Sequence, residues 1–209
     1  MARTMTLWYA PTSPFARKVR VAACELGVDD EIELTETNPW TDERLRRLNP
    51  LSKVPTFVTA DSVVLYESGV ICEYLDALKD PPRLFPPKGP ARWHALLLQG
   101  LADGASTAAG RLFADEHRPA DQRAPTMMAR FSAALAASLD KLETEALAEE
   151  RPAIGEIAVA VFLGYLDFRW PDRNWRAERP KLAGWFARMG ERRSMTDTQH
   201  HLPTGAAHG

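Results

Sequence analysis

The stretch MTLWYAPTSPFARKVRVAACELG, residues 5–27, has the pattern of a strand, a loop and a helix. Residues 5–9 are apolar and aromatic, as in a buried strand, and prolines interrupt the pattern directly afterwards. Apolar residues then recur at helical spacing until Gly27, a residue typical of helix ends. Ser13 precedes Pro14, and proline is favoured at the first position of a helix. We therefore expect Ser13 at the N-terminus of a helix.

Further strands and helices alternate up to about residue 80. The strand patterns lie at 31–37, 56–60 and 63–67, and the helix patterns at 41–49 and 68–79. Only two residues separate the last two strands, which is typical of a tight hairpin. The order is βαβαββα, with a parallel first βαβ unit and an antiparallel hairpin. This predicts a mixed four-stranded sheet covered by helices, the thioredoxin-like arrangement, in an α/β domain spanning residues 1–80.

The rest of the chain has a different pattern. Residues 81–90, PPRLFPPKGP, contain five prolines in ten positions and are interpreted as a linker. Helical spacing then recurs at 91–115, 125–149, 155–168 and 180–190. We expect an all-α domain over 91–209. From about residue 194 periodicity is lost, which predicts a flexible tail.

Composition excludes several kinds of partner. The 26 Lys and Arg residues nearly balance the 28 Asp and Glu residues, so charge indicates neither nucleic acid nor an anionic membrane. The longest apolar run, at 157–166, is shorter than the roughly 20 residues of a membrane span. The N-terminal sequence has no apolar segment of signal-peptide length, which favours the cytoplasm. Cys24 and Cys72 form no CxxC motif, and no metal site is expected.

Four segments together resemble the cytosolic glutathione transferases, in particular bacterial serine-type members, over nearly the whole chain. They are YAPTSPFARKVRVAACELG at 9–27, LNPLSKVPTF at 48–57, LYESGVICEYLD at 65–76 and IGEIAVAVFLGYLDFRWPDRNWRAERPKLAGWFARM at 154–189. Their order is the family's order. The resemblance implies glutathione as cosubstrate, a small electrophile as second substrate, a homodimer and a role in detoxification.

The family's chemistry is attack by the glutathione thiolate on an electrophile. A free thiol has a pKa of about 8.5, so the thiolate must be stabilised near neutral pH. By resemblance, Ser13 is the catalytic residue that donates a hydrogen bond to the sulfur. A helix N-cap is the structural alternative for Ser13, and both roles can coexist. Thr12 and Tyr9 are rival hydroxyls. The basic residues of ARKVR, at 16–20, are expected on a solvated helix face, with Arg17 able to add positive potential.

The resemblance also implies the residues that bind the rest of glutathione. Ser68 and its amide take the γ-glutamyl carboxylate, and Glu67 faces the ammonium; an N-cap is again the structural alternative. Val54 precedes Pro55, which is cis in the family and turns the Val54 backbone toward the cysteinyl part. Lys53 pairs with the glycyl carboxylate, or is a solvated surface lysine.

Residues of the helical domain complete the expected site. Asp103 reaches across a dimer interface to the γ-glutamyl amine, or is an exposed helix acid. Phe15, Phe113 and Trp170 line the electrophile pocket, or belong to the core. One departure from the family stands out. Where members begin the core helix with Ser or Thr and place Asp three residues later, this chain has Ala153 and Glu156, which predicts a weaker helix start.

Three functions follow from this resemblance. The first is a glutathione transferase. The second is a glutathione-dependent isomerase of the maleylacetoacetate type, disfavoured because TSPF does not match that class's SSxS-like loop. The third is a non-enzymatic member that binds glutathione or a protein, since a fold does not determine a function. The joint presence of Ser13, Pro55, Glu67 and Ser68 favours a retained ligand site.

Overall fold

The computed structural model describes residues 4–203, which form two compact units. The first unit contains the described residues 4–87 together with 193–203, and the second contains 88–192. The first unit is therefore built from both ends of the described chain. Its sheet and helices carry most of the residues singled out above.

A mixed four-stranded sheet forms the centre of the first unit. Its strands are β1 (Met5–Tyr9), β2 (Ile32–Glu36), β3 (Thr56–Val58) and β4 (Val64–Tyr66), in the order β2-β1-β3-β4. β1 pairs with β2 in parallel, and the pairs β1/β3 and β3/β4 are antiparallel. This confirms the predicted sheet and the thioredoxin-like arrangement.

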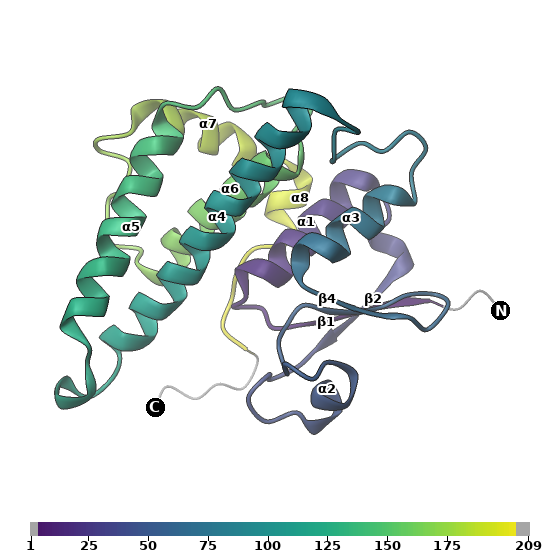
Figure 1. Cartoon of the computed structure of the whole chain (residues 1–209), viewed down its shortest axis with the longest axis horizontal. Helices are drawn as coiled ribbons and strands as arrows, with labels where there is room; N and C mark the ends of the chain where they lie inside the picture. Colours follow the sequence, from purple (N-terminus) through teal and green to yellow (C-terminus); the bar gives the residue numbers. More distant parts are fainter. Residues whose placement is uncertain (1–3, 204–209) are drawn as a thin grey trace. The chain divides into compact units, whose positions relative to one another are not determined.

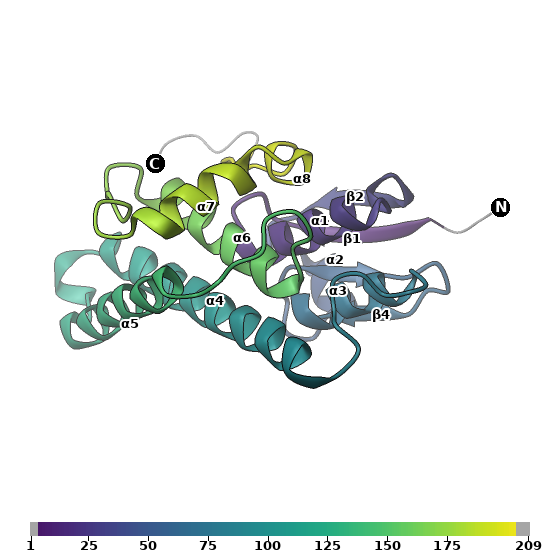
Figure 2. The same ribbon diagram turned by 90° about the horizontal axis from the view of Figure 1, so that it is seen from above.

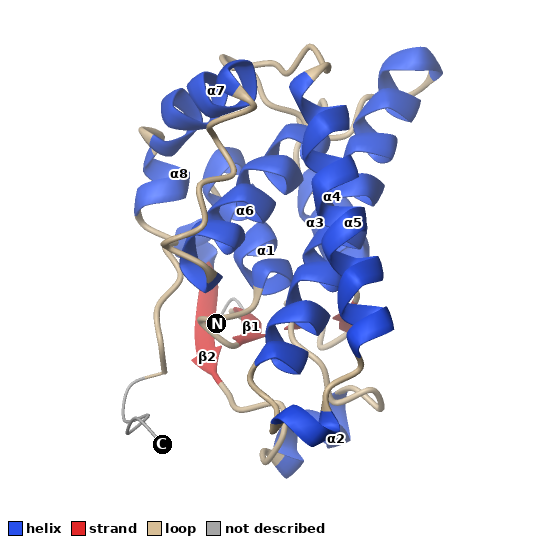
Figure 3. Ribbon diagram, turned by 90° about the vertical axis from the view of Figure 1, so that its left-hand side faces the viewer, coloured by secondary structure: helices blue, strands red, loops and turns tan. Residues whose placement is uncertain are grey.

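Helices cover both faces of this sheet. α1 (Pro14–Leu26) and α3 (Ser68–Ala77) pack against each other on one face, and the short α2 (Glu43–Leu48) lies on the other (Figures 1 and 3). A 3₁₀ turn, η1 (Asp29–Glu31), leads into β2. α1 ends at Gly27, whose φ of +64° suits glycine better than any residue with a side chain. The helix therefore ends at the glycine that the sequence pattern predicted as its end.

The basic face of α1 is not solvated, and that expectation was wrong. Arg17 is 7 % exposed and Lys18 only 1 %. The physical reason is that α1 is covered from two sides, by α3 and by the C-terminal helix α8 (Arg193–Thr196). The Arg17 guanidinium donates to the Met195 carbonyl at 3.1 Å and to Thr198 Oγ1 at 3.4 Å. Residues close to the chain's C-terminus therefore bury a cation that the local pattern assigned to solvent.

A buried carboxylate holds the start of the proline-rich segment. Asp76, near the end of α3, is 1 % exposed and accepts three backbone hydrogen bonds at 2.7–2.9 Å from Arg83, Leu84 and Phe85. A buried carboxylate needs such donors because its charge is costly to remove from water. Leu84 and Phe85 are themselves buried. The segment that composition marks only as a linker is thus fastened to α3.

The second unit is helical (Figure 2). Its helices are α4 (Gly89–Glu116), the 3₁₀ turn η2 (Ala120–Gln122), α5 (Pro125–Glu143), α6 (Ile154–Arg169) and α7 (Pro180–Gly190). α6 is buried along most of its length and packs on α4. A Cβ on Gly155 would lie 2.7 Å from the Ala95 carbonyl oxygen, so this crossing requires glycine. No helix within residues 4–203 combines the length and apolarity needed to cross a membrane.

The start of α6 keeps one half of a capping box. Glu156 accepts the Ala153 N–H at 3.0 Å and is buried, while the methyl side chain of Ala153 can accept nothing. Ala153 has the extended backbone of an N-cap, with φ −83° and ψ 180°. We expect Ala153→Ser to raise the free energy of unfolding by about 1 kcal/mol, because the serine hydroxyl can accept a free N–H of the first turn.

Chemical denaturation of both proteins measures this gain. Ala187→Ser is the matched control, because Ala187 is exposed inside α7, where serine is slightly less favourable than alanine. The control should therefore lose a few tenths of a kcal/mol. Equal stability of Ala153→Ser and the native protein would contradict the predicted capping deficit.

The C-terminal segment differs from the predicted tail. Residues 193–203 belong to the first unit, whereas the pattern assigned everything after residue 91 to the helical domain. Their attachment comes from hydrogen bonds to α1, which no local periodicity encodes. The part of the predicted flexible tail at 204–209 lies outside the described residues.

Candidate functional site

Three strand ends meet at one edge of the sheet. Trp8 of β1 pairs with Thr56 of β3, which pairs with Tyr66 of β4. β4 ends and β3 begins at this row, and β1 ends one residue beyond it, at Tyr9. Adjacent strands are about 4.8 Å apart, so the segments that extend beyond the row are neighbours. The segments that extend beyond this row carry six predicted site residues: Ser13, Lys53, Val54, Pro55, Glu67 and Ser68.

Ser13 is the N-cap of α1. Its backbone is extended, with φ −86° and ψ 119°, and its Oγ accepts the Ala16 N–H at 3.2 Å. A serine hydroxyl has one donor hydrogen and two acceptor positions, so capping leaves the O–H free to donate. The side chain is half-buried, and no acidic residue occupies the first turn of α1. An anion beside Ser13 Oγ would meet the positive end of the helix dipole.

The two cysteines of the chain are poor sources of a thiolate. Burial raises the pKa of the Cys24 thiol, and the nearby Asp29 carboxylate raises it further. Cys72 is completely buried in α3. A thiolate forms most readily where positive charge and solvent are both available. A reactive sulfur at Ser13 would therefore have to come from a ligand.

Asn49 organises the loop that leads into β3, and the sequence pattern missed this role. It is 0 % exposed; its amide Nδ2 donates to the Lys53 carbonyl at 3.1 Å and to Thr56 Oγ1 at 3.0 Å. Its Oδ1 accepts the Leu51 N–H at 3.0 Å. The pattern identified Asn49 only as a helix end. Asn followed by Pro at the entry to a candidate binding loop is a signal that could have suggested a buried loop anchor.

The loop held by Asn49 ends in a cis peptide bond between Val54 and Pro55. This is the isomer that the resemblance implied. Pro55 is buried, Val54 is half-buried and the Lys53 side chain is exposed. The Lys53 carbonyl also accepts a bond from Thr56 Oγ1 at 2.8 Å. Hydrogen bonds therefore hold the loop before Val54, at the Lys53 carbonyl, and after it, at Thr56 Oγ1. The Lys53 side chain stays exposed.

Glu67 has an unusual backbone. Its φ is +69° and its ψ 118°, a region that non-glycine residues rarely adopt. Glu67 is the N-cap of α3, and its exposed side chain caps none of the described N–H groups. Ser68, the first helical residue, is buried. Backbone strain of this kind costs about 1–3 kcal/mol and is concentrated at ligand sites. The α3 N-terminus thus presents amides, a hydroxyl and a carboxylate together.

The rival hydroxyls have distinct environments. The Tyr9 ring lies under the Arg20 guanidinium, with 5.2 Å between the guanidinium carbon and the ring centroid. Burial lowers the pKa of Arg20, and the coulombic effect of Tyr9 opposes that shift. Thr12 is half-buried and directly precedes Ser13. Thr12 remains the closer rival in sequence, whereas Tyr9 is engaged with α1.

The remaining predicted residues divide between the units. Phe15 is half-buried in the first turn of α1. In the second unit, Asp103 is half-buried in α4, and Phe113 meets Trp170 edge-on at 5.8 Å between ring centroids. Trp170 Nε1 donates to Glu116 at 2.7 Å. The Arg169 guanidinium lies 4.4 Å from the Phe113 centroid. Both rings therefore have structural partners where α4 and α6 end.

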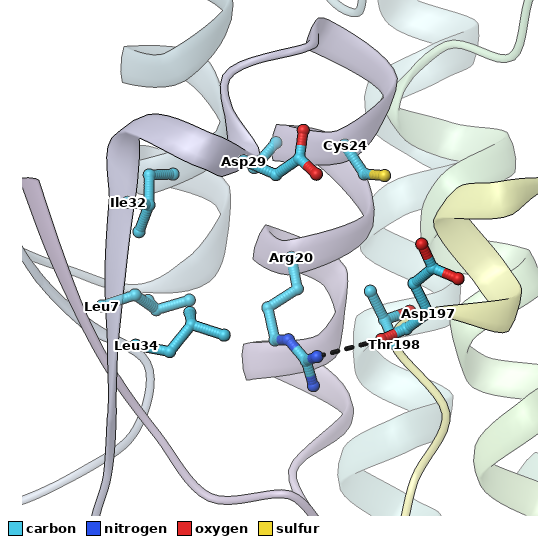
Figure 4. Close-up of a pocket in the computed structure, with 9 residues that line it drawn as sticks. Leu7, Arg20, Cys24, Asp29, Ile32, Leu34, Asp197 and Thr198 are labelled. Carbon is cyan, nitrogen blue, oxygen red and sulfur yellow. Dashed lines mark hydrogen bonds between the residues drawn. The ribbon is translucent and has the colours of Figure 1, made fainter.

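A cavity of about 150 Å³ lies elsewhere in the first unit. It is lined by apolar residues of β1 and β2 and by Arg20, Cys24, Asp29 and Asp197 (Figure 4). None of the predicted site residues lines it, so it is separate from the sheet edge described above. Within residues 4–203, no group of three or more His, Cys, Asp or Glu side chains is placed to hold a metal ion.

Two family models match the chain. The glutathione S-transferase N-terminal domain matches residues 12–78, and the glutathione S-transferase C-terminal domain matches residues 121–188. The first range contains the Ser13 helix start, β2, β3, β4 and α3, and it begins three residues after the end of β1. The second contains α5, α6 and most of α7. Together they cover well over half of the chain.

Known relatives agree with these models. The uncharacterized GST-like protein YibF of Escherichia coli is 29% identical over 90% of this chain and 95% of its own. A glutathione transferase family member from Pseudomonas fluorescens, solved with bound glutathione, is 36% identical with a TM-score of 0.89, covering 96% of this chain and 100% of its own. A stringent starvation protein A homolog of Coxiella burnetii is 39% identical over 45% of this chain and 44% of its own. The chain belongs to the glutathione S-transferase family.

Proposed function

We propose that the protein is a glutathione transferase that activates the thiol of glutathione for attack on a small electrophile. The observation that carries the proposal is the strand register: the segments that carry Ser13, Val54 and the Glu67–Ser68 helix start all extend from the same end of the sheet. The glutathione bound to the Pseudomonas fluorescens and Methylobacillus flagellatus relatives supports it.

The proposed binding mode uses each group according to its charge. Ser68 and the first amides of α3 bind the γ-glutamyl carboxylate, because helix N-termini favour anions. Glu67 pairs with the ammonium, and Lys53 with the glycyl carboxylate. The Val54 N–H and C=O bind the backbone of the cysteinyl residue. These contacts would leave the sulfur next to Ser13.

The proposed reaction begins when the bound thiol loses its proton to solvent. The Ser13 O–H donates a hydrogen bond to the resulting thiolate, and a bond donated to the charged form lowers the thiol pKa. The sulfur lone pair then forms a bond to an electrophilic carbon, and the leaving group departs with the electrons of its bond.

We propose that Phe15, Phe113 and Trp170 line the electrophile pocket. Cytoplasmic placement accords with Cys24 and Cys72 being thiols that form no disulfide.

Calorimetric titration with glutathione, followed by a turnover assay with an aryl halide, tests this function. S-methylglutathione is the matched ligand, because it keeps both carboxylates and the ammonium but has no ionisable thiol. Binding of both ligands with turnover supports a transferase. Binding without turnover of the aryl halide or of a maleylacetoacetate-type substrate favours a non-enzymatic glutathione-binding protein. Turnover of the second substrate alone favours the isomerase. No binding at millimolar glutathione contradicts all of the site assignments.

We also propose that the protein is a homodimer joined through a face of α4. Trp93 and Leu97 are 65% and 72% exposed, and Gly100 and Gly104 continue the same face one and two turns later. A Cβ on either glycine would meet open space, so another helix could approach closely. Large exposed apolar side chains in one stripe favour a protein partner. Asp103 lies next to this stripe, which supports its role across a dimer interface.

We expect Leu97→Glu to convert the dimer to a monomer, because two buried glutamates would face each other near the two-fold axis. Light scattering during size-exclusion chromatography gives the mass. Ala187→Glu, on the exposed face of α7, is the control and should leave the mass unchanged. A native protein of monomeric mass would contradict the proposal. If Asp103 acts across the interface, Leu97→Glu should also weaken glutathione binding.

A further inference from the structure

The C-terminal strap, residues 193–203, runs along α1 toward the Ser13 loop. Its first residues pair with the far end of α1 and with η1, Ser194 with Glu25 and Arg193 with Asp29. The Arg20 guanidinium then donates to the Asp197 carbonyl at 3.2 Å (Figure 4). Further on, Thr198 receives a bond from Arg17. The strap is therefore antiparallel to α1 and approaches its N-terminus.

The strap reaches the Ser13 loop through His200. The distance between His200 Nδ1 and the Pro11 carbonyl oxygen is 3.0 Å. A carbonyl oxygen can only accept a hydrogen bond, so Nδ1 must carry the hydrogen. The bond joins residues that are 189 positions apart in the sequence. His200 thus ties the strap to the peptide group that follows Pro11.

That peptide group is the central peptide of a β-turn, whose orientation differs between turn types. The turn spans residues 10–13, and the Ser13 N–H donates to the Ala10 carbonyl at 2.9 Å. Pro11 and Thr12 occupy its two central positions. Type I and type II turns differ by a flip of the peptide between these two residues, and proline is accepted before the flip in both. A type II turn needs positive φ at its second central residue, which Thr12 does not have. The Pro11 carbonyl belongs to the central peptide, so its hydrogen bond to His200 stabilises the orientation that this turn adopts.

We propose that His200 is a positioning residue for Ser13: by holding the Pro11 carbonyl, it fixes the turn from which Ser13 Oγ is presented to the glutathione sulfur. The Thr12 N–H points opposite to the Pro11 carbonyl, so a flip would re-aim Thr12 and shift its neighbour Ser13. This inference rests on the proposed transferase function for its consequence in turnover. Its structural part, the fixed turn, can be measured without any ligand.

Two substitutions at His200 separate the hydrogen bond from packing. His200→Phe keeps an aromatic ring but has no donor. His200→Asn has a smaller side chain but places an amide N–H₂ where Nδ1–H stood. His201→Phe is the matched control, because His201 is exposed and its Nδ1 lies 2.9 Å from the carbonyl of its own neighbour, Leu202.

Hydrogen exchange of the Ser13 amide in the ligand-free full chain is the first measurement. The Ser13 N–H bonds to the Ala10 carbonyl, so its exchange reports how often the turn opens. We expect exchange in His200→Phe to be roughly fivefold to tenfold faster than in the native protein, because the turn loses a restraint on the scale of one net hydrogen bond. His200→Asn and His201→Phe should exchange at the native rate. Unchanged exchange in His200→Phe, or equally fast exchange in His200→Asn, would overturn the proposal.

Ultraviolet absorbance of the thiolate in the glutathione complex, with kcat for an aryl halide, is the second measurement. His200→Phe should lose part of the thiolate band and lower kcat by roughly fivefold to tenfold, at nearly unchanged glutathione affinity. His200→Asn should restore both. Native values in His200→Phe would overturn the role in presenting Ser13. A native protein without any thiolate band contradicts the transferase function itself, and amide exchange then still decides whether His200 fixes the turn.

Discussion

Replacing Ser13 by alanine is expected to lower turnover of glutathione with an aryl halide roughly hundredfold, the scale of losing one preorganised donor to a developing anion. Glutathione affinity should change by less than about threefold, because the carboxylate and ammonium contacts lie elsewhere on the sheet edge. The pH–rate profile of Ser13→Ala should also rise at higher pH than the native profile. Loss of the hydrogen bond to the thiolate raises the pKa of the bound thiol. At neutral pH a smaller fraction of the bound glutathione is then ionised, and a higher pH is needed to restore the rate.

The Ser13 substitution also removes a helix cap, and this effect has to be separated from catalysis. Ser13 Oγ accepts the Ala16 N–H, so alanine should cost about 1 kcal/mol of stability. Ser13→Asp should keep the cap but repel a thiolate, giving native-like stability with turnover at least as low as that of alanine. Ser13→Thr should keep both properties. Steady-state kinetics and denaturation on the same samples measure the two effects.

Thr12→Val decides between the neighbouring hydroxyls. Valine has nearly the shape of threonine and no hydroxyl, and Thr12 provides none of the bonds that cap α1. If Ser13 is the sulfur donor, Thr12→Val should turn over within about threefold of the native protein. A hundredfold loss in Thr12→Val, with native-like turnover in Ser13→Ala, would transfer the proposed role to Thr12.

The sequence pattern predicted the secondary-structure elements, and the positions of the candidate residues along them, because both depend on local chemistry. Ser13 before Pro14 indicates a helix start, and the structure has α1 begin at Pro14. Glu67 and Ser68 were expected between a strand and a helix, and they lie between β4 and α3. Local patterns could not show that these points are neighbours. That follows from the strand register, in which Trp8, Thr56 and Tyr66 form one row.

The pattern failed where distant segments change a residue's surroundings. Arg17 has the appearance of a solvated cation until Met195 and Thr198 bury it. Asn49 has the appearance of a helix end until its amide meets Lys53 and Thr56. In each case a polar side chain finds partners in a segment that its own helix does not contain. Hydrophobic periodicity carries no information on such bonds, because it describes only which face of an element is apolar.

Glu67 offers a test in which ligand binding and stability change independently. Glu67→Gln keeps the side-chain volume and the strained backbone but removes the charge that the proposal pairs with the ligand ammonium. We expect glutathione to bind roughly tenfold more weakly, since Glu67 is exposed and its ion pair is partly screened. A glutathione analogue without the α-amino group should bind both proteins equally, because it offers no ammonium to lose.

Glu67→Gly should weaken glutathione binding by a similar factor while making the free protein more stable. Glycine relieves a positive-φ strain of about 1–3 kcal/mol and costs about 0.5–1 kcal/mol in chain entropy, so a net gain of about 1 kcal/mol is expected. Ser62→Gly is the control: Ser62 has φ +67° on the hairpin between β3 and β4, so its replacement should stabilise the protein at unchanged affinity. Denaturation and calorimetry distinguish the outcomes. If Glu67→Gly is no more stable than the native protein, or binds glutathione with native affinity, the strained backbone at Glu67 does not serve ligand binding.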